Sequence, residues 1–360
     1  MGCGKRSLTM AAVALVCAIT VLGAPGMASA APANPTPTPT PPAAPTTKSG
    51  KDLEAVREKL DKLYHDAAVA TDAYNAAEEK TGKQSTQIVE LAKAIVKGQA
   101  KLDSLQDRAG AAARAQYRGG GLPPEAQLWL SDSPQEYLDG AGRVRQGEHG
   151  TKGLLAEMKR TQQDLAQYTK DASAQWERLE ANRKTRAAAK KKIKQRIAAA
   201  EKLESQLEKD EKKRLAKLEE DAAYQAQTAW LSSGVLKEIN SKASAQGKKA
   251  VEYATAQVGL PYVWGAEGPK SFDCSGLTSQ AWASAGHPIP RTSQQQWQQL
   301  ERVDIKDMRP GDLVIYFADA SHVGMYIGDG AIVHAPRPGR TVTITGAGSM
   351  PILGVVRPDK

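Results

Sequence analysis

The chain has 360 residues, enough for two or three folded units, and a formal charge of +9 from 49 basic and 40 acidic residues. The excess lies in residues 51–249, which hold 37 basic and 30 acidic residues, whereas residues 250–360 hold 9 and 10. A basic middle region fits contact with an anionic surface, such as polymers or lipid headgroups, or simply a solvated lysine-rich helical face. Nothing in the pattern points to nucleic acid.

The N-terminal segment has the pattern of an export signal. Two basic residues precede an apolar run over residues 8–22, and Ala-Ser-Ala at 28–30 forms an A-x-A cleavage site. The apolar run is shorter than the roughly 20 residues that span a bilayer. We therefore expect residues 1–30 to be a signal peptide and the mature protein to be secreted, with a lipid anchor on Cys17 as the minor alternative.

Two different segments follow the predicted signal peptide. Residues 31–50 alternate proline and threonine, which predicts an extended linker. Residues 51–240 predict a coiled-coil helical region, because apolar residues recur at heptad positions a and d over about 60 residues. The a positions are Leu53, Leu60, Ala67, Tyr74, Thr81, Ile88, Ile95, Leu102 and Ala109, and the d positions are Val56, Leu63, Ala70, Ala77, Gln84, Leu91, Gly98, Leu105 and Ala112.

Glycine and proline divide this helical region into two parts. The segment YRGGGLPPEAQ, residues 117–127, interrupts the first helix and predicts a hairpin tip. Residues 154–233 contain neither glycine nor proline and could form one helix roughly 120 Å long. Two long helices joined by a tip most simply pack antiparallel on each other, and a dimeric coil is the alternative.

The composition changes again near residue 248. Strand-like runs lie at residues 313–317, 322–328, 331–335, 341–345 and 353–357, and the turn signals RPGD and GDG separate several of them. Residues 248–259 and 275–286 have helical character. The sequence thus predicts an α+β domain over residues 248–360, with helices packed on an antiparallel sheet and enough residues for a core of its own.

Cys274 is the cysteine that remains after removal of the predicted signal peptide, because Cys3 and Cys17 precede the cleavage site. It therefore has no partner for an internal disulfide, and its thiol is a buried structural group, an intermolecular link or a reactive group. The residues after Cys274 have the spacing of an amphipathic helix. A thiol at a helix N-terminus is favoured as the thiolate by unpaired N–H groups and the helix dipole.

A cysteine nucleophile needs a base and a group that orients this base. His322 begins one predicted strand and His334 ends the next, so adjacent antiparallel strands can place them side by side. His334 would then hold one nitrogen of His322 while the other nitrogen faces Cys274. Each histidine could instead be structural, as we expect for His287. A zinc site is a minor alternative, because no paired ligand spacing supports it, and we expect no metal and no cofactor.

Several segments of residues 250–360 together resemble the NlpC/P60 family of cell-wall peptidases. They are GLPYVWGAEGPKSFDCSGLTSQAW, PRTSQQQW, DMRPGDLVIY, SHVGMYIGDGAIVHAP and GVVRP, in the expected order. The resemblance implies a circularly permuted papain-like fold, with Cys274 as nucleophile, His322 as general base and His334 as the residue that orients it. Ala266 stands where many members have glycine, which affects only the shape of that loop.

The same resemblance assigns further residues to the site. Tyr262 matches a family tyrosine whose hydroxyl points into the site and can stabilise an oxyanion, although it also suits a core. Asp273 and Ser275 match positions that line the substrate cleft, and Asp273 could equally cap a helix. Trp264 and Arg291 are weaker candidates for substrate contact, because Trp264 suits a core and Arg291 a local ion pair.

The resemblance implies a secreted or wall-associated peptidoglycan hydrolase. We expect a cysteine endopeptidase that cleaves stem peptides at the bond between γ-D-glutamate and a diamino acid. The alternatives are a wall-binding protein without turnover and a thiol amidase or acyltransferase of the same superfamily. Anionic wall polymers are further candidate partners of the basic middle region.

The helical region resembles the N-terminal coils of secreted actinobacterial wall hydrolases, notably in ARAQYRGGG and SDSPQEYLD. This implies a role in positioning or restraining the enzyme, by covering the cleft or by docking on a divisome-type regulator. A simple stalk is the alternative.

Overall fold

The computed structural model describes residues 50–118, 126, 129–130, 133–239 and 242–359. The predicted signal peptide, the predicted linker up to residue 49 and most of the predicted hairpin tip lie outside these residues. Among the described residues, no helix is both long enough and apolar enough to cross a membrane.

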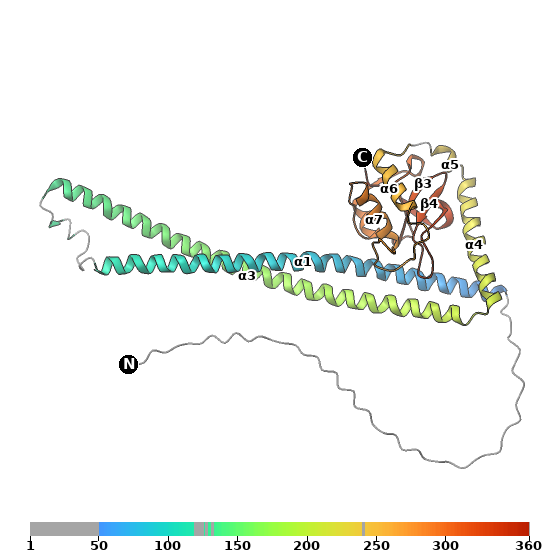
Figure 1. The fold of residues 1–360 in the computed structure, drawn as a ribbon, viewed down its shortest axis with the longest axis horizontal. Coiled ribbons are helices and arrows are strands. Elements are labelled where there is room, and N and C mark those ends of the chain that lie inside the picture. Colours follow the sequence, from blue (N-terminus) through green and yellow to red (C-terminus); the bar gives the residue numbers. More distant parts are fainter. Residues whose placement is uncertain (1–49, 119–125, 127–128, 131–132, 240–241, 360) are drawn as a thin grey trace, which may run out of the picture. The chain divides into compact units, whose positions relative to one another are not determined.

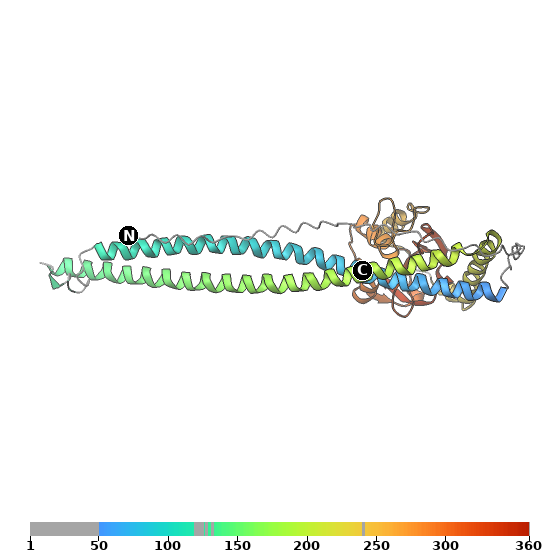
Figure 2. The same cartoon turned by 90° about the horizontal axis from the view of Figure 1, so that it is seen from below.

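Two long helices, α1 (Gly50–Arg118) and α3 (Pro134–Ser205), lie side by side and run in opposite directions (Figures 1 and 2). Tyr64, early in α1, bonds to Glu204 at the end of α3, whereas Lys101, late in α1, pairs with Glu157 nearer the start of α3. The antiparallel arrangement predicted from the sequence is confirmed. Many of the predicted seam residues are buried, namely Leu53, Leu60, Ala67, Ala70, Tyr74, Ala77, Leu102 and Leu105.

The second helical segment is broken, and the single helix considered for residues 154–233 is wrong. Helix α3 ends at Ser205, and α4 (Lys209–Ser232) begins after three intervening residues. The backbone N–H of Glu208, at the start of α4, has no acceptor within the helix. It donates instead to the side-chain carboxylate of Glu211 at 2.9 Å. Leu207, between the helices, is buried with Leu53, so packing stabilises the break without glycine or proline.

Helix α4 leads to a terminal α+β domain, as predicted. Its six strands form one antiparallel sheet in the order β1-β6-β2-β3-β4-β5. The elements are α5 (Val235–Glu238), α6 (Ala245–Thr255), α7 (Cys274–Ser284), α8 (Ser293–Gln299), β1 (Glu301–Val303), η1 (Ile305–Asp307), β2 (Leu313–Tyr316), β3 (His322–Gly328), β4 (Ala331–His334), β5 (Thr343–Gly346), η2 (Ala347–Ser349) and β6 (Ile352–Arg357). All five predicted strands are present, with β5 starting two residues later than expected, and α8 and β1 were not predicted.

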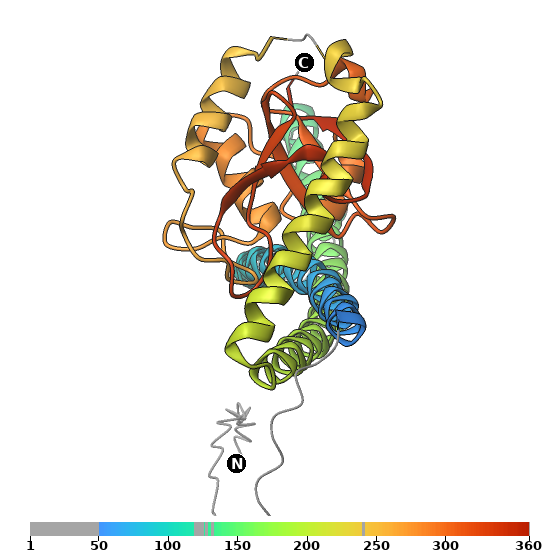
Figure 3. The ribbon, with the colours of Figure 1, turned by 90° about the vertical axis from the view of Figure 1, so that its right-hand side faces the viewer.

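The sheet is covered on both faces, which explains why β2 is apolar at every position. Alternate residues point to opposite faces, so Leu313 and Ile315 pack with α6 and α7, whereas Val314 and Tyr316 belong to a second cluster that includes Trp230 of α4. Figure 3 shows α4 on one side of the sheet and α6 on the other. The chain that leaves the long helices thus forms part of the domain's own core.

The contact between α4 and the sheet edge is close. The side chain of Gln227 donates to the carbonyl of Gly330 at 3.2 Å and accepts from the backbone N–H of Gly348 at 2.6 Å. A Cβ added at Gly348 would lie 2.3 Å from the Cβ of Trp230, so glycine is needed there for this approach. Helix α4 is therefore fastened to the end of the sheet that carries β5.

Two isoleucines of the sheet provide a matched test of this core. Ile315 in β2 is fully buried, whereas Ile344 in β5 is 49% exposed. We expect Ile315→Ala to lower the free energy of unfolding by about 2–5 kcal/mol, because it removes buried contacts and leaves a cavity, and Ile344→Ala to cost about 1 kcal/mol or less. Urea unfolding followed by tryptophan fluorescence measures both; equal losses would contradict the assigned core.

Candidate active site

Cys274 is the first residue of α7, as the sequence predicts. The preceding residue, Asp273, has extended backbone geometry and its carboxylate accepts from the N–H of Gly276 at 2.6 Å, which caps the helix. The thiol therefore lies at the positive end of the helix dipole. It is buried, and it is the free cysteine of the described residues.

The two histidines predicted to be neighbours lie together at the ends of adjacent strands. Nε2 of His322, at the start of β3, is 2.8 Å from Nδ1 of His334, at the end of β4. Gly324 provides the space, because a Cβ there would lie 2.5 Å from the side chain of Ile332 and 3.4 Å from the Cβ of His334. The hydrogen bond uses one nitrogen of His322 and leaves Nδ1 for another partner.

The thiol and the histidine pair meet where α7 abuts β3. The backbone N–H of Val323, next to His322, and that of Ser275 both favour the Cys274 thiolate. These contacts are outweighed: burial raises the pKa of Cys274 well above its ordinary value, and the charges of Asp273 and Asp72 raise it further. Burial of the thiol therefore favours its protonated form.

Burial also controls the two imidazoles. It lowers the pKa of His322 to about 4, against a smaller opposing effect of the Asp273 charge. Burial also lowers the pKa of His334 well below its ordinary value, and the neighbouring His322 adds to that effect. Both rings are therefore neutral near pH 7, and one of them donates the hydrogen bond that joins them.

Arg291 is held against the start of α7 by the same capping carboxylate. Its guanidinium binds Asp273 through two nitrogens, at 2.7 and 3.0 Å, and also donates to the Ser275 hydroxyl at 3.0 Å. A third contact, 2.6 Å long, reaches Glu267 at the surface. The structure thus brings three predicted site residues into one network, and Asp273 acts as a helix cap within it.

Tyr262 and Trp264 come from the loop between α6 and α7, and both touch α1. Tyr262 is buried, which raises its pKa, and the nearby side chain of Thr71 has a smaller opposing effect. The ring of Trp264 meets Tyr74 edge-on, with 5.2 Å between the ring centroids. Trp264 also packs on the domain core, which is one of the two roles considered for it, and its contact with substrate stays a prediction.

Further contacts of α1 with the site were not predicted. Asn75 donates from Nδ2 to Asp273 at 3.1 Å, and the Ser293 hydroxyl donates to Asp72 at 2.6 Å. One feature of the sequence does indicate that this part of α1 is covered by other residues. The segment AAVATDAYNAA, residues 67–77, has a single charged residue, whereas the exposed positions of a coiled coil usually hold many.

The site has the parts for thiol chemistry: a sulfur at a helix N-terminus, a neutral imidazole beside it, and a second imidazole that fixes the ring of the first. Within the part of the chain that the structure describes, no group of three or more His, Cys, Asp or Glu side chains is placed to hold a metal ion.

Comparison with known proteins identifies the terminal domain. Residues 259–350 match the model of the NlpC/P60 family. A Corynebacterium glutamicum protein named "Probable endopeptidase" is 38% identical over 140 residues, which are 39% of this chain and 66% of that protein. A Mycobacterium tuberculosis protein of the same name is 44% identical over 94 residues, 26% of this chain and 24% of the relative. The chain thus spans less than two thirds of either relative.

Among solved structures, the NlpC/P60 domain of the peptidoglycan hydrolase SagA is 29% identical, with a TM-score of 0.29. The match covers 31% of this chain and 97% of that domain.

The lowered histidine pKa values predict a pH dependence of stability. An unfolded chain protonates each imidazole near pH 6.5, whereas folded His322 stays neutral down to about pH 4. The unfolded state binds more protons in this window, so these histidines make the free energy of unfolding fall as the pH drops from 6.5 to 4, by up to about 1.4 kcal/mol per pH unit for each.

Asp72 has the opposite effect on the free energy of unfolding. Burial raises its pKa to about 7, so the stability that protonated Asp72 contributes at low pH is lost as the pH rises through that value. The measurement is therefore a comparison of urea unfolding at several pH values between the wild type and a His322→Gln, His334→Gln double variant. We expect the double variant to lose the positive slope and His287→Gln to keep it. An unchanged slope in the double variant would show that these imidazoles are not buried as neutral groups.

Proposed function

Residues 259–350 form an NlpC/P60 family domain, and from this premise we propose that the chain is an exported peptidoglycan hydrolase. Its activity is that of a cysteine endopeptidase on wall stem peptides, at the bond between γ-D-glutamate and a diamino acid. Similarity to proteins named as endopeptidases supports a peptidase. The finer assignment of bond and substrate rests on the family resemblance of the motifs around Cys274.

One observation carries the proposal: the cysteine at the start of α7 interacts with the backbone N–H of Val323, the residue after His322, and the ring of His322 is hydrogen-bonded to His334 at 2.8 Å. A purely structural cysteine requires neither a helix N-terminus nor a fixed imidazole. The His334 contact orients the ring of His322, so that Nδ1 of His322 is the nitrogen available to the thiol. This is the relation of nucleophile, base and orienting group that covalent catalysis requires.

The reaction follows from these positions. Nδ1 of His322 accepts the thiol proton while the sulfur of Cys274 bonds to the amide carbonyl carbon. The carbonyl oxygen becomes an oxyanion, and the group proposed to stabilise it is the hydroxyl of Tyr262. His322 then gives its proton to the amide nitrogen, the carbon–nitrogen bond breaks, and the amine leaves with the acyl group held as a thioester.

Water completes the cycle. His322 accepts a proton from the water as its oxygen bonds to the thioester carbon, and the carbon–sulfur bond then breaks to release the acid and restore the thiol. Ser275, Arg291 and Trp264 are the proposed substrate contacts beside the nucleophile. Asp273 positions the nucleophile and Arg291 through the cap and the ion pair already described.

Export is supported by the charged, apolar and Ala-Ser-Ala sequence of residues 1–30. The charge of residues 51–249, 37 basic against 30 acidic, suits an anionic wall polymer as a further partner. Both statements belong to the proposal.

Incubation of the purified chain with defined muropeptides tests the proposed activity. We expect cleavage with fragment masses that locate the bond, and Cys274→Ala to reduce the rate by roughly 10³-fold or more, because it removes the nucleophile. His322→Gln should cost about 10²- to 10⁴-fold, since it removes the base. The matched substitution His287→Gln, in the same domain, should leave the rate unchanged.

Cleavage that persists in Cys274→Ala would overturn the cysteine mechanism. Binding of muropeptides without any fragment would favour the wall-binding alternative, and transfer of the acyl group to an amine would favour an acyltransferase.

A further inference from the structure

His334 has a second hydrogen-bond partner besides His322, the hydroxyl of Thr345 in β5. Nδ1 of His334 lies 2.8 Å from Nε2 of His322, and Nε2 of His334 lies 3.4 Å from Oγ1 of Thr345. His334 is 4% exposed, so a ring nitrogen without a partner would be costly. In the described part of the chain, the Thr345 hydroxyl is the one hydrogen-bond partner of this nitrogen.

The pairing of β4 with β5 brings Thr345 to His334. In this register His334 lies opposite Thr343, and Ile332 lies opposite Thr345. Thr345 is therefore the diagonal neighbour of His334 on the same face of the two strands, within reach of an imidazole. Ile344, between the two threonines, points away from that face and is half exposed.

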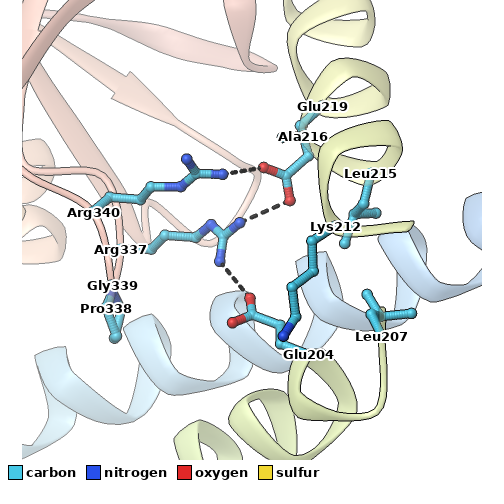
Figure 4. A pocket seen from close by; sticks show the side chains of 10 residues that line it. All are labelled: Glu204, Leu207, Lys212, Leu215, Ala216, Glu219, Arg337, Pro338, Gly339 and Arg340. Carbon is cyan, nitrogen blue, oxygen red and sulfur yellow. Dashed lines mark hydrogen bonds and ion pairs between the residues drawn. The ribbon is translucent and has the colours of Figure 1, made fainter. Parts of the chain in front are cut away.

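Contacts with α4 fix β5 and the loop that precedes it. In the loop, Arg337 and Arg340 bind the two carboxylate oxygens of Glu219 in α4, at 2.8 and 2.6 Å (Figure 4). In β5, a Cβ added at Gly346, the residue after Thr345, would clash with a side chain of α4. The hydroxyl of Thr345 is thus held on a supported element, as a hydrogen bond of fixed direction requires.

Proton uptake by His322 fixes the direction of both hydrogen bonds. When Nδ1 of His322 accepts the thiol proton, both of its ring nitrogens carry hydrogen and both are donors. Nδ1 of His334 then has to accept, so the hydrogen of this neutral ring lies on its Nε2. That hydrogen points at Thr345, whose hydroxyl oxygen has a lone pair to accept it.

The same direction is needed before the reaction starts. Nδ1 of His322 is a base only while the hydrogen of that ring lies on Nε2, where it donates to His334. In the reverse arrangement Thr345 donates to His334, His334 donates to His322, and Nδ1 of His322 carries the hydrogen. Whether the Thr345 hydroxyl accepts or donates therefore decides whether His322 can take the thiol proton.

We propose that Thr345 is a positioning residue of the active site, whose hydroxyl accepts from Nε2 of His334 and thereby makes Nδ1 of His322 the proton acceptor. Its catalytic consequence rests on the proposed function, whereas the tautomers of the two rings are measurable without any activity. Hydrogen bonds in a chain polarise one another, so the terminal acceptor stabilises protonated His322 more than the neutral ring.

Three variants test the effect on cleavage of muropeptides by the full chain. Thr345→Val removes the hydroxyl at nearly constant shape, and we expect kcat to fall about tenfold with KM unchanged, because a hydrogen bond of the charged state is lost. Thr345→Ser keeps the hydroxyl and should restore kcat to within about twofold of the wild type. Thr343→Val is the matched control in the same strand and should leave kcat unchanged.

Nitrogen-15 NMR of the full chain labelled at histidine reports which ring nitrogen carries hydrogen. The chain has five histidines, and His322→Gln and His334→Gln assign the two signals of interest. Near neutral pH we expect both rings to carry hydrogen on Nε2 in the wild type and in Thr345→Ser. In Thr345→Val the Nε2–H of His334 would be buried without an acceptor, so we expect both rings to shift toward the Nδ1–H form.

The two measurements separate this proposal from the proposed function. Reversed tautomers with slower cleavage in Thr345→Val support both. Reversed tautomers in that variant, with no cleavage even by the wild type, support the role of Thr345 and overturn the endopeptidase assignment. Nδ1–H rings in the wild type, or tautomers unchanged in Thr345→Val, overturn the role of Thr345, and cleavage that still depends on Cys274 would then leave the enzyme assignment standing.

Thermal melting by circular dichroism compares the folding of each variant with that of the wild type. The tautomers of the wild type need no variant, so they test the role of Thr345 even if Thr345→Val does not fold. Equal loss of kcat in Thr343→Val and Thr345→Val would show a general effect of β5 and would also overturn the proposed role.

Discussion

The fully buried carboxylate of Asp273 is the interaction on which both the site and its closure depend. One of its oxygens accepts from the Gly276 N–H, the other from the Gly265 N–H, and Arg291 binds both. The cap fixes the start of α7 and therefore the thiol. Asn75 of α1 completes the coordination of the same carboxylate, so the group that positions the nucleophile also binds the helix that covers it. Closure therefore leaves the catalytic geometry in place.

The closed state keeps the nucleophile unreactive through electrostatics as well as through blocked access. Burial and two nearby carboxylates hold the Cys274 thiol in its protonated form, and burial keeps His322 neutral. Displacement of α1 would remove the Asp72 carboxylate and admit water, and both changes would favour the ion pair of thiolate and imidazolium. The contacts of α1 thus bear both on access to the sulfur and on its ionisation.

The parts of the fold that sequence patterns predicted are those governed by local periodicity. Strands β3 and β4 and the position of His334 beside His322 follow from alternation and a tight turn, and the α1 seam follows from heptads. The break after Ser205 was missed because it depends on the packing of Leu207 against a distant helix, not on glycine or proline. Covering of the cleft by the helical region was expected from the resemblance, but the α1 residues that contact the site were not identified, because heptad analysis describes the seam alone and the partner of Asn75 lies about 200 residues away in the sequence.

Helix α1 continues without interruption from Gly50 to Arg118, so the residues beside the active site and the far end of the helix belong to one rod. With the contact between Tyr64 and Arg337 as the pivot, Asn75 lies roughly 17 Å along the rod and Arg118 roughly 80 Å, at 1.5 Å per residue. A sideways pull at the far end is thereby multiplied about fivefold at Asn75 by leverage alone. A lateral force at the distal end of α1 therefore reaches the hydrogen bond between Asn75 and the Asp273 carboxylate that caps α7.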